Sequence, residues 1–138
     1  MINSIFSDGG ARGNPGPAAS AFVVLDNAEN ILYKSSKYLG QQTNNYAEYQ
    51  GVLLALTWLS ENIQMIDEPI NFFMDSELVV KQINGIYKVK EPTLQKLNKE
   101  VASLIERIAK KIVFQNVPRA KNKLADSLVN EELDKSSS

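Results

Sequence analysis

The stretch 51–59, GVLLALTWL, constrains the fold most, because it is apolar on almost every side of a predicted helix. The helical pattern begins near Asn45 and continues to about Ser60. A helix with one apolar stripe lies on a surface, whereas a helix that is apolar all round is buried on more than one side. The chain must therefore place this helix between layers, and its 138 residues are enough for one domain with a substantial core.

The rest of the pattern predicts a layered α/β domain. Strands are expected at 2–8, 20–26, 31–39, 70–74 and 111–117, and helices at 45–60, 76–84, 93–109 and 120–133. Short turns join the first three strands, which favours an antiparallel meander. The order βββαβααβα then gives a five-stranded mixed sheet, three antiparallel strands followed by two parallel ones, with helices on both faces. We expect a single domain over 1–134 and a disordered tail over 135–138.

The composition excludes several kinds of chemistry. The chain has no cysteine and no histidine, which rules out disulfides, thiolate zinc sites and histidine-based catalysis. Catalysis would have to use carboxylates, lysines, hydroxyls or a bound metal. No stretch reaches the ~18 apolar residues of a membrane span, and the N-terminus lacks the pattern of a signal peptide. We therefore expect a cytoplasmic protein without a membrane partner.

The net charge of −1 hides a strong asymmetry along the chain. Residues 1–80 hold three basic and nine acidic side chains, whereas residues 81–123 hold eleven basic and three acidic ones. Solvated lysines on a single helix would need no special explanation. A basic block that runs through several elements favours a polyanionic partner such as nucleic acid.

Four carboxylates occur in settings that a structural role explains only in part. They are Asp8 in SIFSDGG, Glu48 in TNNYAEYQ, Asp75 in INFFMDSEL and Asp126 in NKLADSLVN. Asp8 and Asp75 each follow an apolar strand-like run, so both would emerge at one end of the sheet if their strands are parallel neighbours, ~4.8 Å apart. Acidic groups gathered in one place repel each other unless cations neutralise them. Oxygen ligands of this kind suit Mg²⁺.

Structural roles are possible for the first three of these residues. Asp8 precedes Gly-Gly, and Asp-Gly is a turn signal. Asp75 lies where a strand meets a helix and could cap that helix. Glu48 follows Asn45 by three residues, so it could close a capping box if Asn44 or Asn45 is the N-cap residue.

Asp126 also has a structural alternative. It lies four residues after Asn122 and four before Asn130, so these polar groups share one helical face that could simply be solvated. Each signal alone is weak, whereas the ordered set of four favours a metal-dependent nuclease.

Together these segments closely resemble ribonuclease H of type 1, from about Ser4 to Asp134. The likeness rests on SDGGARGNPGPAA, TNNYAEYQGVLLAL, DSELVVKQINGIYKVK and VPRAKNKLADSLVN, in the family's order and at compatible spacing. It implies the ribonuclease H-like fold and cleavage of the RNA strand of RNA–DNA hybrids with 5′-phosphate products. It also implies that the four carboxylates are catalytic and hold two Mg²⁺ ions, for which Mn²⁺ could substitute.

The resemblance further implies a monomeric enzyme whose nucleic-acid contacts surround these carboxylates. The implied contacts are Gly9, Gly10, Arg12, Asn14, Asn44, Asn45, Ser76 and Asn122, to which we add Lys88 and Arg119 from the basic block. Two departures from the family pattern stand out: the loop before the last helix has no histidine, and 85–92 is too short for the family's extra basic helix and loop. Lys88 and Lys90 are candidates to replace part of that grip.

Two other functions compete with a catalytic ribonuclease H. One is a nucleic-acid-binding relative without turnover, which the retention of all four carboxylates disfavours. The other is a nuclease of the same fold that acts on double-stranded RNA or on DNA branch points. The glycine-rich segment and the TNN segment favour hybrid recognition over that alternative.

Overall fold

Five strands form one mixed sheet in the order β3-β2-β1-β4-β5 in the computed structural model, which describes residues 1–137. The strands are β1 (Ile2–Ala11), β2 (Gly16–Asp26), β3 (Ile31–Gln42), β4 (Ile66–Met74) and β5 (Ile112–Asn116). β1, β2 and β3 pair antiparallel, β4 runs parallel to β1, and β5 runs parallel to β4. The predicted sheet of three antiparallel and two parallel strands is confirmed.

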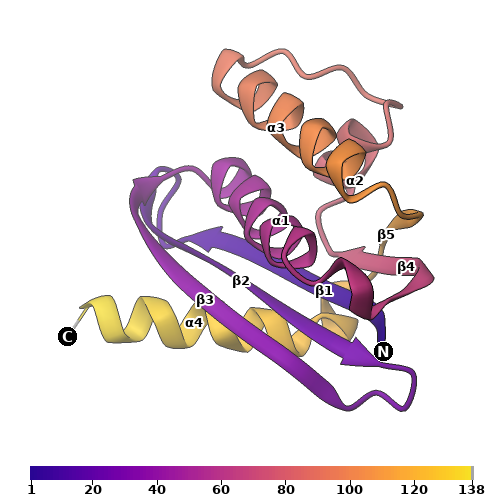
Figure 1. Cartoon of the computed structure of the whole chain (residues 1–138). Helices are drawn as coiled ribbons and strands as arrows, with labels where there is room; N and C mark the ends of the chain where they lie inside the picture. The colour runs from indigo at the N-terminus through magenta and orange to yellow at the C-terminus, as the bar shows by residue number, and fades with distance from the viewer. Residues whose placement is uncertain (138) are drawn as a thin grey trace.

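Helices cover both faces of this sheet, as predicted. They are α1 (Asn44–Ser60), α2 (Glu77–Ile83), α3 (Pro92–Ile108) and α4 (Lys123–Ser137), with 3₁₀ turns at Ile63–Met65 and Arg119–Lys121. In Figure 1, α1 lies in front of the sheet, α4 crosses behind it, and α3 lies beyond α1. Among the helices of residues 1–137, none is long and apolar enough to cross a membrane.

The helix α1 is the buried middle layer that its sequence predicts. Tyr49, Val52 and Leu56 are fully buried within the main core, which α1 shares with the sheet and with the apolar stripe of α3. On the opposite face, α4 packs Val129 and Leu133 against small side chains of β2. β2 is buried along nearly its whole length because helices cover it on both sides.

Two glycines allow α1 to lie directly on β1. A Cβ atom on Gly9 would come within 2.2 Å of the backbone carbonyl of Ala47, and one on Gly51 within 2.8 Å of the carbonyl oxygen of Asp8. The hydroxyl of Ser20 also donates to the carbonyl of Ala47 at 2.6 Å. This close approach brings one face of α1 against the middle of β1.

The glycine-rich segment after Asp8 is mostly strand, where the sequence predicted a turn-rich connection. β1 continues to Ala11 and β2 begins at Gly16, with Asp8 paired to Ala21. The parallel pairing of β1 with β4 ends at Phe6. β1 continues beyond this point because it remains paired with the antiparallel strand β2. The prediction that Asp8 ends its strand was therefore wrong.

The N-cap residue of α1 differs from the predicted one. Thr43, and neither Asn44 nor Asn45, caps α1 by accepting the N–H of Tyr46 at 3.2 Å. Asn44 is engaged elsewhere, because its side-chain oxygen accepts the N–H of Ala11 at 2.8 Å.

The tail expected to be disordered over 135–138 is helical over 135–137, so that prediction was wrong for these residues. In this last turn Ser136 donates its hydroxyl to the carbonyl of Glu132 at 3.0 Å, and Lys135 pairs with the Glu132 carboxylate at 3.7 Å. Ser138 lies outside the described residues. The single-domain boundary at 1–134 stays a prediction.

Candidate active site

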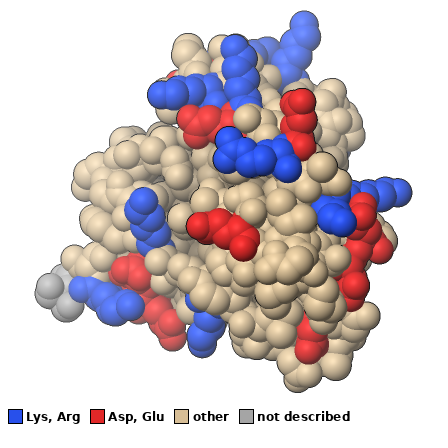
Figure 2. Space-filling model, in the orientation of Figure 1, with Lys and Arg blue, Asp and Glu red and all other residues tan. Residues whose placement is uncertain are grey.

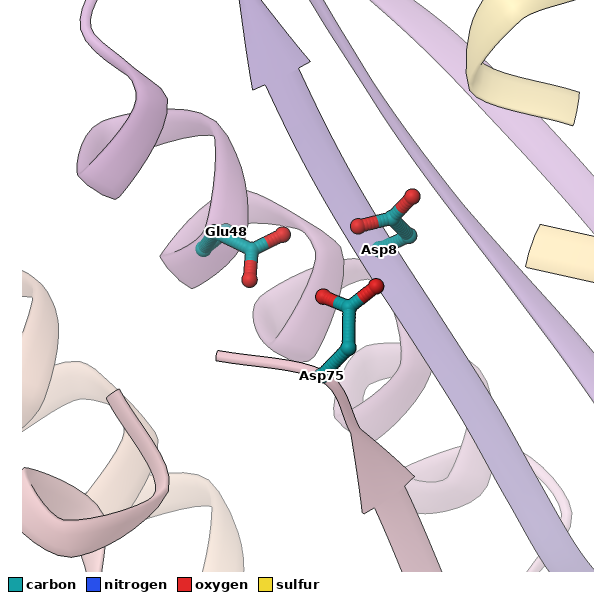
Figure 3. A group of neighbouring side chains, drawn as sticks. All are labelled: Asp8, Glu48 and Asp75. Atoms are coloured by element: carbon teal, nitrogen blue, oxygen red, sulfur yellow. The ribbon is translucent and has the colours of Figure 1, made fainter. Parts of the chain in front are cut away.

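Three of the four carboxylates converge at one place on the sheet. Figure 3 shows Asp8 on β1, Glu48 on α1 and Asp75 just past the end of β4 pointing toward one another. One oxygen of each lies within 4.8 Å of the others. The register explains this meeting, because Phe6 pairs with Phe73 on parallel strands and the two aspartates follow by two residues on each strand. The predicted parallel neighbourhood is confirmed.

Glu48 is held against the sheet by a backbone contact. Its carboxylate accepts the N–H of Gly9 at 2.5 Å, and the side chain is only 6% exposed. Because Thr43 caps the helix, Glu48 does not close a capping box. The glutamate faces Asp8 because α1 lies so close to β1.

Asp75 is free of the capping role that its position suggested. Ser76 is the N-cap residue of α2 and accepts the N–H of Val79 at 3.3 Å. The carboxylate of Asp75 is therefore left to face Asp8 and Glu48.

Asp126 stands at the edge of the group. It lies in the first turn of α4, and one of its oxygens pairs with the guanidinium of Arg119 at 3.4 Å. Its side chain is 29% exposed, and it is not among the three carboxylates whose oxygens meet. Asp126 thus lines the same cavity as the other three carboxylates, but it is paired with the guanidinium of Arg119.

Burial and mutual repulsion raise the pKa values of the converging acids. Burial raises the pKa of Asp8 from its ordinary 3.8 to about 7, with a contribution from the charge of Asp75. The pKa of Glu48 is raised well above its ordinary value, first by burial and then by the charge of Asp8. The pKa of Asp75 is also raised by burial, while hydrogen bonding from Asn122 and the charge of Arg119 oppose the shift.

The donor set fits a hard divalent cation. It consists of carboxylate oxygens from three elements, without nitrogen or sulfur ligands, and such oxygens are what Mg²⁺, Mn²⁺ or Ca²⁺ bind. Like charges buried this close are unfavourable unless a cation neutralises them. The raised pKa values agree with this, since without a cation each of these acids loses its proton at a higher pH than usual.

A cavity of about 530 Å³ opens over these acids. Its walls include most of the residues implied to contact nucleic acid, namely Gly9, Gly10, Arg12, Asn44, Asn45, Ser76 and Arg119. A second cavity of about 560 Å³ lies between α1, α3 and β3. Its walls mix aromatic and apolar side chains such as Trp58 with polar and charged ones, and the three converging acids do not line it.

Three implied contacts do not line the cavity over the acids. Asn14 accepts the N–H of Asn44 at 3.0 Å and so fixes the start of α1 beside the β1–β2 turn. Lys88 lies in the loop between α2 and α3. Asn122 is 1% exposed, and its amide is turned inward.

Sequence reasoning missed four residues of the cavity wall: Ala11, Val129, Asn130 and Leu133. Asn130 had a usable signal, because it follows Asp126 by four residues and shares its helical face. Val129 and Leu133 belong to the apolar face of α4, and their spacing alone predicts that they are buried in the core.

Comparison with known proteins identifies the family. A family model described as reverse transcriptase-like matches residues 6–132. LC11-RNase H1, solved in complex with an RNA/DNA hybrid, is 46% identical, with a TM-score of 0.93 and complete coverage, 100%, of both chains. This chain belongs to the ribonuclease H1 family.

Other ribonuclease H1 proteins agree with this assignment. The structure of RNase H1 from Halobacterium salinarum is 33% identical, with a TM-score of 0.88, over 97% of this chain and 98% of that one. A bifunctional protein of Mycobacterium tuberculosis is 39% identical over 131 residues, which is 94% of this chain and 35% of that protein. The chain thus spans about a third of the length of its mycobacterial relatives.

The raised pKa values predict how the stability of this ribonuclease H1 domain depends on pH without metal. In the unfolded chain the acids titrate near their ordinary values, so between about pH 4 and pH 7 the folded state holds protons that the unfolded state has lost. Folding stability present at low pH is therefore lost as the pH rises through 7. At about 1.4 kcal/mol per pKa unit, we expect the melting temperature in EDTA to fall by roughly 5–10 °C from pH 5 to pH 8.

Thermal unfolding of the wild type and of Asp8→Asn, with EDTA or with Mg²⁺, measures this effect. Mg²⁺ should restore most of the loss at pH 8. Asp8→Asn should flatten the dependence in EDTA, because it removes the charge that repels the other acids. Identical pH dependence in the two proteins would contradict the prediction.

Proposed function

We propose that this chain is a metal-dependent endoribonuclease that hydrolyses the RNA strand of RNA–DNA hybrids and leaves 5′-phosphate ends. The meeting of Asp8, Glu48 and Asp75 within 4.8 Å carries the proposal, because it supplies an acidic metal site on an open cavity. The close similarity to LC11-RNase H1, which was solved with an RNA/DNA hybrid, supports this choice of substrate.

Asp8, Glu48 and Asp75 would hold the metal, and Asp126 would complete the set from the edge of the cavity. We propose Mg²⁺ as the physiological ion, two ions with substrate, and Mn²⁺ as a substitute. When bound, such ions supply the Lewis acidity that activates water and stabilises the departing 3′ oxygen. No nucleophilic side chain is required, so the absence of cysteine and histidine is compatible with this chemistry.

Arg119 would bind phosphate beside the acids. Its side chain is 78% exposed, yet its guanidinium is kept near the cavity by Asp126. Arginine suits this role because its planar group can donate two hydrogen bonds to one phosphate.

Asn44, Asn45 and the backbone of Gly9 and Gly10 would recognise the RNA strand. They line the cavity, and amide groups can both donate to and accept from a 2′-hydroxyl. The bond from the N–H of Ala11 to Asn44 fixes these two segments relative to each other. The monomeric state and the cytoplasmic location remain predictions.

The direct test is cleavage of matched substrates. The purified protein is incubated with an RNA–DNA hybrid, an RNA duplex, a DNA duplex and single-stranded RNA of one sequence, with Mg²⁺ or with EDTA. We expect cleavage of the hybrid alone, only with Mg²⁺, and products with 5′-phosphate. Preference for the RNA duplex, or hybrid binding without cleavage, would favour one of the two competing functions.

The basic loop 84–91 should contribute a grip on the substrate that is independent of sequence. Figure 2 shows Lys and Arg side chains gathered at the top of the molecule, over α3 and the loop before it, with acidic side chains between them. The loop is held in place, because Gln82 donates to the carbonyl of Lys88 at 3.4 Å and Gln95 to that of Val89 at 2.9 Å. Lys88 and Lys90 are thus carried on a braced segment.

Reversal of both charges, Lys88→Glu with Lys90→Glu, should weaken binding to every duplex about tenfold at low salt. The slope of log affinity against log salt should fall by about 2, because fewer counterions are released. Reversal of the exposed Lys34 and Lys37 on β3 makes the same change in net charge and serves as the control. Equal effects of the two double variants would show that only net charge matters.

A further inference from the structure

Asn122 connects the segments that carry the acids. It lies between the 3₁₀ turn Arg119–Lys121 and α4, and is 1% exposed. Its side-chain NH₂ donates to the carbonyl of Ser7 at 2.9 Å. Ser7 directly precedes Asp8, so this bond ties the start of α4 to β1 at the first carboxylate.

The same residue reaches a second carboxylate segment. Its backbone carbonyl accepts the N–H of Asp126 at 3.1 Å, in the first turn of α4. One buried side chain and its backbone thus join the segments of Asp8 and Asp126.

The orientation of the amide follows from its neighbour. The carbonyl of Ser7 is an acceptor, so the NH₂ group of Asn122 must face it. The side-chain oxygen of Asn122 has no hydrogen-bond partner among the described residues.

We propose that Asn122 is a positioning residue that fixes Asp8 relative to Asp126 at the start of α4 for metal binding, rather than a contact to nucleic acid. This inference rests on the proposed function for its metal site. A carboxylate whose backbone segment is already fixed binds metal without first losing conformational freedom. Asn122 is too deeply buried to touch a substrate in the cavity, whose wall it does not form.

Binding of Mn²⁺ to the metal-free full chain, measured by calorimetry without nucleic acid, tests the inference. Asn122→Ala should bind Mn²⁺ about 10–100-fold more weakly than the wild type, as is usual when the outer support of a metal site is removed. Asn62→Ala is the matched control, because Asn62 also donates its amide to a backbone carbonyl, that of Trp58 at 2.8 Å, but neither residue lines the cavity over the acids. The control should stay within about twofold of the wild type, since its bond fixes no segment that carries an acid.

Kinetics with the hybrid separate positioning from contact. In Asn122→Ala, kcat at fixed Mg²⁺ should fall and should recover at higher Mg²⁺, while KM for the hybrid stays near the wild-type value. Asn122→Ser leaves a smaller void and is used in the same way if the alanine variant does not yield folded protein, as judged by circular dichroism.

Two outcomes would overturn the inference. One is wild-type Mn²⁺ affinity in a folded Asn122 variant, and the other is a raised KM for the hybrid with unchanged Mn²⁺ binding. Failure of the wild type to cleave hybrids would instead contradict the proposed function. The calorimetric comparison would still decide the role of Asn122 in that case, because it contains no substrate.

Discussion

Asp75→Asn should lower hybrid cleavage by on the order of 10³-fold or more, because it removes a metal ligand and with it several kcal/mol of transition-state stabilisation. Hybrid binding should survive. The asparagine keeps the shape of the side chain, and one negative charge fewer reduces the repulsion of phosphates from the cavity. Asp75 is the least enclosed of the three converging acids, so the exchange should leave the core intact.

Three measurements test these effects of Asp75→Asn: the cleavage rate with Mg²⁺, the affinity for the hybrid in Ca²⁺, and the melting temperature. Asp67→Asn is the control, because Asp67 lies on the same strand, β4, but is exposed and outside the site. It should cleave like the wild type. Cleavage by pure Asp75→Asn at the wild-type rate would remove the basis for the assigned metal site.

Gly9→Ala should nearly abolish activity and should also destabilise the fold. The new methyl group would lie 2.2 Å from the backbone carbonyl of Ala47, and backbone atoms of a packed helix cannot yield as a side-chain end can. α1 must therefore move away from β1 and carry Glu48 out of reach of Asp8. A displacement of about 1 Å can cost 10²-fold in rate, and overpacking costs ~1–3 kcal/mol.

Gly10→Ala is the matched control for the stability effect. A Cβ atom there would meet only a methyl group of Val129, at 4.0 Å, which is an ordinary contact. Its melting temperature should stay within about 2 °C of the wild type, whereas Gly9→Ala should lose roughly 5 °C or more. Mn²⁺ affinity should fall in Gly9→Ala alone. Equal melting temperatures in the two variants would show that α1 accommodates the methyl group.

The fold class could be predicted because apolar spacing reports burial directly. The apolar stretch 51–59 required a helix between layers, and the structure places α1 between the sheet and α3. The ends of the strands were harder to predict, because the length of β1 depends on the strands that pair with it. The glycines after Asp8 suggest a turn by local preference, but pairing with β2 overrides that preference.

The sequence named the three acids that converge, but it did not predict the geometry of their contacts. Four acids in recognisable segments named the candidates, and the parallel pairing of β1 and β4 explains why two of them meet. No local pattern could indicate that Asp126 would pair with Arg119, or that Asn122 would turn inward to Ser7. The contact of Asn122 with Ser7 depends on where the start of α4 lies relative to β1, because it joins residues 115 positions apart.

The three converging acids come from a strand, a helix and the end of a second strand, so no isolated piece of the chain contains the site. Asp8 and Asp75 meet only after β1 and β4 have paired, and Glu48 joins them only after α1 has packed on β1. A bound divalent ion would therefore fasten these elements together and select the closed native state over any form in which α1 has opened. Metal occupancy of this chain would accordingly report complete tertiary assembly, and saturating metal should slow amide hydrogen exchange along the buried face of α1.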